Sequence, residues 1–119
     1  MKRIGEFSKS FWHAFRGLKY VLRNEKNFQN ELLIGLLVVI AMIYYDITRA
    51  EMIVLIIIIM GVLIMELLNT IMERVVDILK PRVHPYARLI KDLMAAGVLL
   101  TSILAIIIGL LIFIPYIFK

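Results

Sequence analysis

The chain has 119 residues, and 62% of them are hydrophobic, compared with ~45–50% in an ordinary soluble domain. A soluble domain of this length has room for only one small core, so a soluble monomer is not expected. The net charge of +5 is compatible with binding to nucleic acid or to an anionic membrane surface. Cysteine is absent from the sequence, which excludes disulfides and thiolate-based sites.

The N-terminal segment is amphipathic. At about 100° per residue, five large apolar residues fall within about 80° of one another on a helix: Phe7, Phe11, Phe15, Leu18 and Leu22. The opposite side carries Lys9, His13, Arg16, Lys19 and Arg23. The pattern predicts a surface helix over about residues 5–23 that lies in the plane of the membrane interface. Nucleic-acid binding is not expected, because the second face of this helix is so apolar.

Three apolar blocks follow, at residues 32–45, 52–65 and 93–114. The last has no charged residue, and at a rise of about 1.5 Å per residue it is long enough to cross the ~30 Å hydrocarbon core of a bilayer. The first two reach this length if their polar ends face protein or water. We therefore predict an all-α integral membrane protein that forms a single domain over residues 1–119. The predicted spans are about 29–46, 51–79 and 91–116.

Basic residues are distributed unevenly around these spans. Twelve of the fourteen lie before the first span or between residues 74 and 91, two regions that a three-span topology places on the same side of the membrane. The other two are Arg49 and Lys119. Lysine and arginine are enriched in short cytoplasmic segments. We therefore expect a multi-pass protein of the cell membrane, with a cytoplasmic N-terminus and an external C-terminus.

Several polar residues fall where the second span should be apolar. On a helix they share a face about 80° wide: Glu66, Asn69, Glu73 and Asp77. Carboxylates at the end of a span are costly to desolvate, so they are candidates for a functional site by default. The topology places further polar residues at the same depth: Glu25, Glu31, Lys91 and Asp92.

This set of side chains fits the needs of phosphoryl transfer. Clustered carboxylates favour Mg²⁺, which is typically bound through one or two carboxylates plus substrate phosphates, and basic residues suit phosphate oxygens. A carboxylate partly removed from water can act as a general base. The sequence has neither GxxxxGK[ST] nor GxGxxG, so no standard nucleotide motif is present. From the residues alone, a network of salt bridges in a helical oligomer is an equally open interpretation.

Two segments carry a resemblance to a known family. Residues 66–77 read ELLNTIMERVVD, and Lys91-Asp92 follows after a Pro-rich break; residues 24–31 read NEKNFQNE. This combination resembles the signature of the small bacterial diacylglycerol kinase family, and the likeness covers nearly the whole chain. The resemblance implies a homotrimeric membrane kinase that transfers the γ-phosphoryl group of ATP to a lipid hydroxyl at the cytoplasmic interface, with Mg²⁺ as the metal.

The resemblance also implies roles for particular residues. Glu66 matches the proposed catalytic base, and Asn69 matches its polar neighbour in the site. Glu25 and Glu73 match the metal-bridging glutamates. Positions that contact ATP are matched by Arg82, His84, Lys91 and Asp92, and positions near the lipid by Asn27 and Glu31. His13 departs from the pattern, since the enterobacterial members carry Tyr there.

The acceptor lipid is the least determined part of this interpretation. The loop at residues 80–86 and the ending at residues 106–115 look like those of the Gram-positive branch, whose members prefer undecaprenol. We therefore expect an undecaprenol kinase that produces undecaprenyl phosphate, with a diacylglycerol kinase that produces phosphatidic acid as the alternative. Two hypotheses from other classes stay open: a small proton or cation transporter subunit that uses the same carboxylates, and a non-catalytic membrane scaffold.

Overall fold

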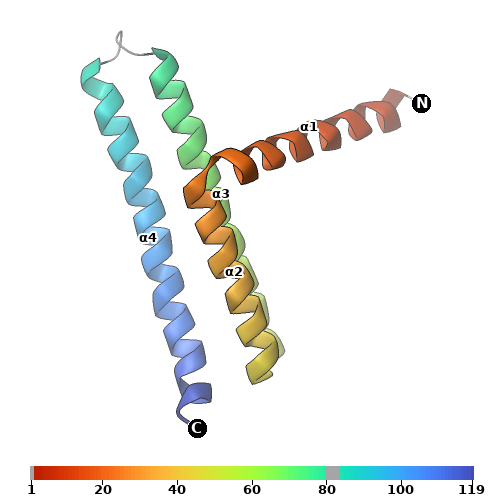
Figure 1. Cartoon of the computed structure of the whole chain (residues 1–119), viewed down its shortest axis with the longest axis vertical. Coiled ribbons are helices and arrows are strands. Elements are labelled where there is room, and N and C mark those ends of the chain that lie inside the picture. The colour runs from red at the N-terminus through yellow and green to blue at the C-terminus, as the bar shows by residue number, and fades with distance from the viewer. Residues whose placement is uncertain (1, 80–83) are drawn as a thin grey trace.

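The structure is a computed structural model that describes residues 2–79 and 84–119, and only the backbone of His84. It contains four helices: α1 (Lys2–Asn24), α2 (Lys26–Tyr45), α3 (Arg49–Leu79) and α4 (His84–Ile117). The last three run side by side, and α1 leaves them at a steep angle (Figure 1). Each of these three is long and apolar enough to cross a membrane. The predicted all-α fold with three spans is therefore confirmed.

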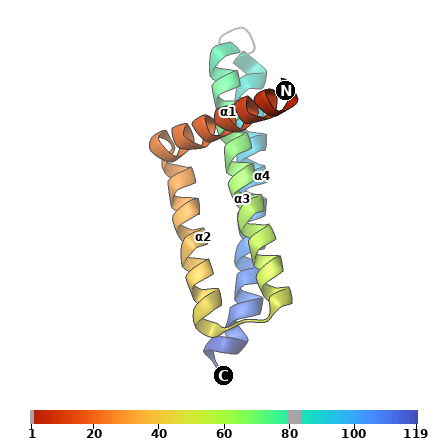
Figure 2. The ribbon, with the colours of Figure 1, turned by 90° about the vertical axis from the view of Figure 1, so that its right-hand side faces the viewer.

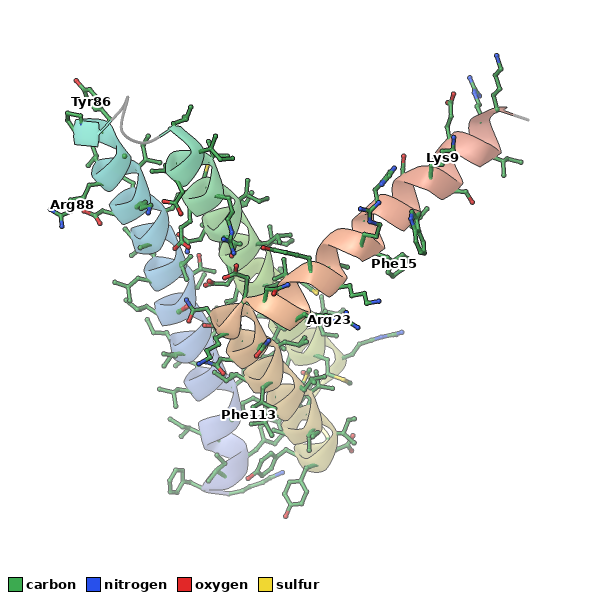
Figure 3. The ribbon with its side chains drawn as sticks, turned by 45° about the horizontal axis from the view of Figure 1, so that its top comes forward. Lys9, Phe15, Arg23, Tyr86, Arg88 and Phe113 are labelled. Carbon is green, nitrogen blue, oxygen red and sulfur yellow. The ribbon has the colours of Figure 1, made fainter. Side chains whose placement is uncertain are left out.

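Helix α1 touches the rest of the molecule only near its C-terminal end, where Val21 is its one buried residue. Its large apolar side chains are exposed, among them Phe7 and Phe15. Figure 3 shows α1 standing clear of the other helices from its N-terminus to Phe15. An uncovered apolar face opposite a basic one is the arrangement expected of a helix lying in a membrane interface.

A tight turn joins α2 to α3. Asp46 ends α2 with a left-handed backbone, φ 51°, a conformation that closes many helices. Thr48 and Glu51 then form a capping box: the Glu51 backbone N–H donates to Thr48 Oγ1 over 3.2 Å, and the Thr48 N–H donates to Glu51 Oε1 over 3.0 Å. Between them, Ile47 is buried against Met42 and Leu55. The turn is thus rigid, and it fixes the angle between the two helices.

Two glycines mark where the helices approach most closely. A Cβ added to Gly97 of α4 would lie 2.8 Å from Cε of Met65 on α3, and one added to Gly35 of α2 would lie 2.9 Å from Cγ2 of Ile59 on α3. Small residues allow such approaches in membrane proteins.

At the far end of the bundle, the Tyr116 hydroxyl donates a hydrogen bond to Glu51. This bond connects α4 to the start of α3.

The unequal helix lengths position the site. Helices α3 and α4 have 31 and 34 residues, whereas α2 has 20. Figure 2 shows that the connected ends of α3 and α4 therefore extend past α1. Glu25, the single residue between α1 and α2, meets α3 part of the way along its length instead of at its end. This joint brings polar residues of α2 against the polar face of α3.

We expect Gly35→Ala to destabilise the protein by about 1–3 kcal/mol, because the added Cβ meets the Ile59 side chain. Gly109→Ala is the matched control, since no atom lies within 4 Å of the Cβ that it would add. Thermal unfolding of both variants in one detergent, followed by circular dichroism, gives the comparison. Equal midpoints would show that α2 and α3 do not approach each other at this point.

Candidate active site

Glu66 is the centre of the candidate site. It lies on the face of α3 turned toward α2, and only 4% of its surface is exposed. Asn69 and Thr70, in the next turn of the same helix, are also buried. The Thr70 hydroxyl donates to the Glu66 backbone carbonyl over 3.1 Å, so this hydroxyl is satisfied within the helix. The Glu66 carboxylate needs its partners from elsewhere, because a buried charge without hydrogen bonds is strongly unfavourable.

Those partners come from the start of α2. The Asn27 side chain is a hydrogen-bond partner of the Glu66 carboxylate. Three further carboxylates lie close enough to act on Glu66 electrostatically: Glu25, Glu31 and Glu73. We call these four glutamates the acid cluster. Like charges at short range repel one another, so the excess of negative charge in the acid cluster favours a cationic ligand.

Asn69 lies between members of the acid cluster and has one unused oxygen. Its Nδ2 donates to Glu73 Oε1 over 3.2 Å, which orients the amide. Its Oδ1 is buried and has no hydrogen-bond partner among the described residues. A buried acceptor without a donor calls for an explanation. A hydroxyl donor or a metal ion bound in the site would provide one.

Two ion pairs border the acid cluster on the side away from the apolar spans. Arg74 of α3 pairs with Glu25 at the α1–α2 joint. Lys91 of α4 pairs with Asp77 of α3, with 2.8 Å between Nζ and Oδ1. The polar face of α3 is therefore in contact with the α1–α2 joint on one side and with α4 on the other. These contacts place basic groups next to the carboxylates.

The residues expected at the site are only partly brought together. Asn27, Glu31 and the two expected metal ligands, Glu25 and Glu73, gather around Glu66. Lys91 approaches α3 through Asp77, whereas Asp92 is exposed and is not among the groups acting on Glu66. Arg82 and the side chain of His84 lie outside the described residues, and His13 is exposed on α1.

Arg74 is the charged residue that the sequence analysis did not assign to the site. Its only local signal is its position, directly after Glu73 and one turn before Asp77. On a helix it points about 100° away from Glu73, so the shared polar face of α3 does not include it. Its contact with Glu25 depends on the angle between α1 and α2, which the sequence pattern does not contain.

The side chains around Glu66 suit a metal ion whose remaining ligands come from water and substrate phosphates better than a metal ion held by protein ligands alone. Within residues 2–79 and 84–119, no group of three acidic or histidine side chains converges closely enough to hold a metal ion. Mg²⁺, however, is usually held by one or two carboxylates, with waters and substrate phosphates completing its ligands. Glu25 and Glu73, with the free Oδ1 of Asn69 nearby, fit that arrangement.

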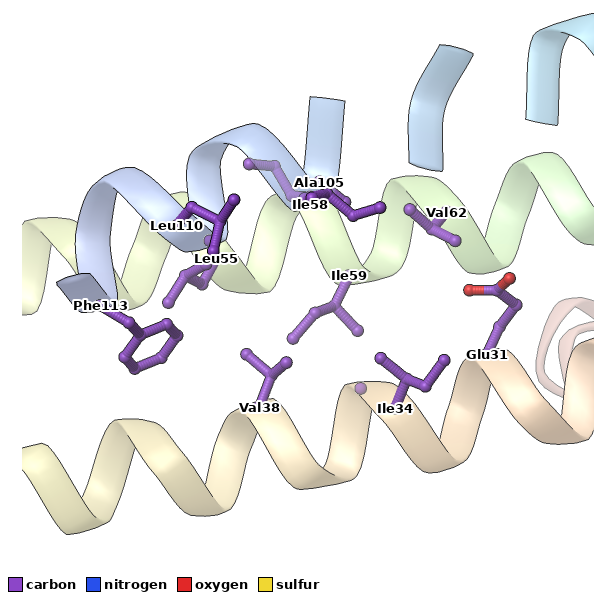
Figure 4. Close-up of a pocket in the computed structure, with 13 residues that line it drawn as sticks. Glu31, Ile34, Val38, Leu55, Ile58, Ile59, Val62, Ala105, Leu110 and Phe113 are labelled. Carbon is purple, nitrogen blue, oxygen red and sulfur yellow. The ribbon is translucent and has the colours of Figure 1, made fainter. Parts of the chain in front are cut away.

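An apolar cavity begins beside the acid cluster and runs between α2, α3 and α4. Its volume is about 340 Å³. Glu31 lies at one end and Phe113 at the other, and the lining between them is aliphatic, including Ile34, Val38 and Ile59 (Figure 4). The acid cluster thus lies at one end of this cavity, and the space next to it suits a hydrocarbon chain and not a hydrated ion.

The fold and the site together define a class of protein: a small helical membrane protein whose carboxylates gather at one interface, beside basic groups able to hold phosphate. The sequence model of a family described as prokaryotic diacylglycerol kinase matches residues 12–113. The chain belongs to this family.

Characterised relatives carry two related names. An undecaprenol kinase from Bacillus subtilis (strain 168) is 37% identical over 112 residues, which cover 94% of this chain and 91% of that protein. A diacylglycerol kinase from Synechocystis sp. is 35% identical over 101 residues, covering 84% of this chain and 58% of that protein. The diacylglycerol kinase of Escherichia coli (strain K12) is 32% identical over 99 residues, which cover 83% of this chain and 81% of that protein.

We expect Glu66→Gln to raise the stability of the ligand-free protein by about 1–2 kcal/mol, because it removes a buried negative charge that faces three others. The amide oxygen of glutamine can still accept from Asn27. Glu6→Gln removes the same charge from the exposed surface of α1 and should leave stability unchanged. Unfolding midpoints in one detergent provide the measurement; a lower midpoint for Glu66→Gln than for wild type would contradict the described repulsion.

Proposed function

We propose that this protein is an undecaprenol kinase, which transfers the γ-phosphoryl group of ATP to the hydroxyl of undecaprenol at the cytoplasmic face of the cell membrane. The observation that carries the proposal is the buried Glu66 carboxylate, held among Asn27 and three other glutamates at the level where α1 meets α2. Membership of a lipid kinase family implies ATP as the phosphate donor. The relative that covers 94% of the chain is an undecaprenol kinase and supports this acceptor.

Glu66 is the general base of the proposed reaction. The lipid hydroxyl gives its proton to the Glu66 carboxylate while its oxygen attacks the γ-phosphorus of ATP in line with the leaving group. One O–P bond to the lipid forms, the bond between the γ-phosphorus and the bridging oxygen breaks, and ADP leaves. Burial of Glu66 keeps water away from the reacting atoms. Asn69 is proposed to assist by orienting Glu73, to which its Nδ2 donates a hydrogen bond.

The other charged residues have distinct proposed roles. Mg²⁺, when bound, offsets the charge that develops on the phosphates, and Glu25 and Glu73 are the residues that would hold it. Lys91 and Asp92 are proposed contacts to ATP, since they belong to α4, whose connected end extends past α1. Arg82 and the His84 side chain, which lie outside the described residues, are proposed as further ATP contacts from the family resemblance alone. Asn27 and Glu31 are proposed to contact the lipid, because both act on the Glu66 carboxylate and Glu31 also lines the apolar cavity.

The membrane arrangement is proposed on two grounds. Twelve of the fourteen basic residues precede the first span or lie between residues 74 and 91 of the sequence, which supports a cytoplasmic N-terminus and an external C-terminus. No residue in the apolar part of α4 is buried within a single chain, although α4 carries the small residues typical of helix interfaces. This supports assembly of the chain as a homotrimer, with lipid covering the remainder.

A transporter subunit is less well supported than a kinase. A path for protons or cations needs polar groups across the whole membrane. Between Glu31 and Phe113 the cavity is lined by apolar side chains, and the tyrosines Tyr45 and Tyr116 pack against the buried cluster of Met42, Ile47 and Leu55 next to the turn. A scaffold, in turn, gives no reason to bury Glu66.

Diacylglycerol is the second candidate for the acceptor lipid. It is supported by the names of two relatives and of the family.

The acceptor can be tested directly. We expect purified protein with labelled ATP and Mg²⁺ in mixed micelles to phosphorylate undecaprenol at a higher kcat/KM than diacylglycerol. A preference for diacylglycerol would overturn the choice of acceptor alone. Absence of label in both lipids would overturn the kinase function.

We expect Glu66→Gln to lower kcat by at least about 10²-fold, since general-base catalysis typically contributes 10²–10⁴-fold. Binding of a non-hydrolysable ATP analogue should change little, because the phosphate contacts are made by other residues. Glu6→Gln serves again as the control of equal charge. Near wild-type turnover by Glu66→Gln would remove Glu66 from the role of base, whatever lipid is phosphorylated.

A further inference from the structure

Four charged residues alternate in sign across the rim of the site. Glu25 at the α1–α2 joint pairs with Arg74, and Asp77 pairs with Lys91 of α4. Asp77 also interacts electrostatically with Arg74, which links the two pairs. The row therefore runs from α1 across α3 to α4, along the edge of the acid cluster. Its two cations, Arg74 and Lys91, both lie next to Asp77.

Arg74 has a particular position in this row. Among the described residues, its guanidinium makes the salt bridge to a member of the acid cluster, while Lys91 is paired outside the cluster. The Arg74 side chain is 55% exposed, whereas the Glu25 side chain is 19% exposed. The arginine thus reaches inward from water to neutralise a carboxylate that is largely shielded. An exposed ion pair of this kind contributes little net stability, so it can be exchanged readily.

The charge of the expected ligand makes such an exchange favourable. A nucleoside triphosphate brings several phosphate oxygens, and a guanidinium binds phosphate through two parallel hydrogen bonds more readily than it binds a single carboxylate oxygen. Lys91 is already the expected phosphate contact of this region. Because Arg74 and Lys91 flank the same Asp77, one polyphosphate chain can meet both.

We infer that Arg74 is a phosphate-binding residue of the donor site that exchanges partners: it pairs with Glu25 in the empty site and with phosphate oxygens of the nucleotide in the loaded one. This inference rests on the proposed function. It assigns Arg74 two effects of opposite sign. Arg74 strengthens nucleotide binding by adding a contact. It weakens binding of a divalent cation to the empty site, because it occupies the Glu25 oxygen that the cation would need.

The role of Arg74 can be tested because its removal should change nucleotide affinity and divalent-cation affinity in opposite directions. The probes are adenylyl imidodiphosphate with Mg²⁺, measured by isothermal titration, and Mn²⁺ without nucleotide, measured by electron paramagnetic resonance. Arg74→Gln should weaken nucleotide binding about tenfold, the scale of one charge-assisted hydrogen bond, and tighten Mn²⁺ binding severalfold. Arg74→Lys keeps the charge without the forked geometry, so both of its shifts should be smaller.

Arg88→Gln is the matched control, because Arg88 lies at the same end of the molecule but points away from α3 (Figure 3). It removes the same charge and should shift neither affinity by more than about twofold. Adding Glu25→Gln to Arg74→Gln should abolish the gain in Mn²⁺ affinity, since that gain depends on the freed carboxylate. A thermal unfolding scan of each variant confirms that the folded proteins are being compared.

Either of two results overturns the role of Arg74: nucleotide affinity that is unchanged in Arg74→Gln, or Mn²⁺ affinity that is equal to or weaker than that of the wild type. If the wild type phosphorylates lipid in the same preparation, that result leaves the proposed function intact. Conversely, both shifts in a protein that phosphorylates no lipid would support the role of Arg74 as a phosphate contact and overturn the kinase function.

Discussion

The burial of the Glu66 carboxylate is the constraint on which the rest of the structure depends. A charge that is 4% exposed in a helix of membrane-spanning length is costly, and the chain meets that cost in two ways. It places Glu66 near the end of the apolar run, where α2 begins, and it supplies the Asn27 amide from across the helix interface. The α1–α2 joint has to lie at this level, because Asn27 and Glu25 belong to it.

The charges around Glu66 are arranged for a ligand more than for stability. Three glutamates act electrostatically on a fourth, Glu66, and an amide oxygen of Asn69 is left without a partner in the described structure. Natural proteins accept such locally unfavourable groups mainly at functional sites. The basic partners, Arg74 and Lys91, stand at the exposed rim and not inside the cluster. The interior therefore keeps its negative charge, and the rim offers positive charge where water-soluble phosphates would arrive.

The remainder of the molecule separates this polar level from the other side of the membrane. The cavity between the helices begins at Glu31 and is lined by apolar side chains as far as Phe113, toward the capping box of Thr48 and Glu51. Each end of the bundle is held by polar contacts between helices, by Tyr116 with Glu51 at one end and by Lys91 with Asp77 at the other. Lipid chains and water-soluble phosphates can thus approach the same carboxylates from different directions.

The sequence by itself determined the four helices and the level of the polar residues, because periodicity, apolar run length and proline positions are local properties. The pattern Thr48-Arg-Ala-Glu51 is also a local capping signal, and the structure contains that capping box. The tertiary structure alone decided that Asn27 meets Glu66, that Arg74 pairs with Glu25 across 49 residues of sequence, and that Asp92 is exposed. These outcomes depend on the rotation and crossing angle of helices that are distant in sequence. Packing at Gly35 and Gly97 helps to set that geometry, which no single-helix pattern records.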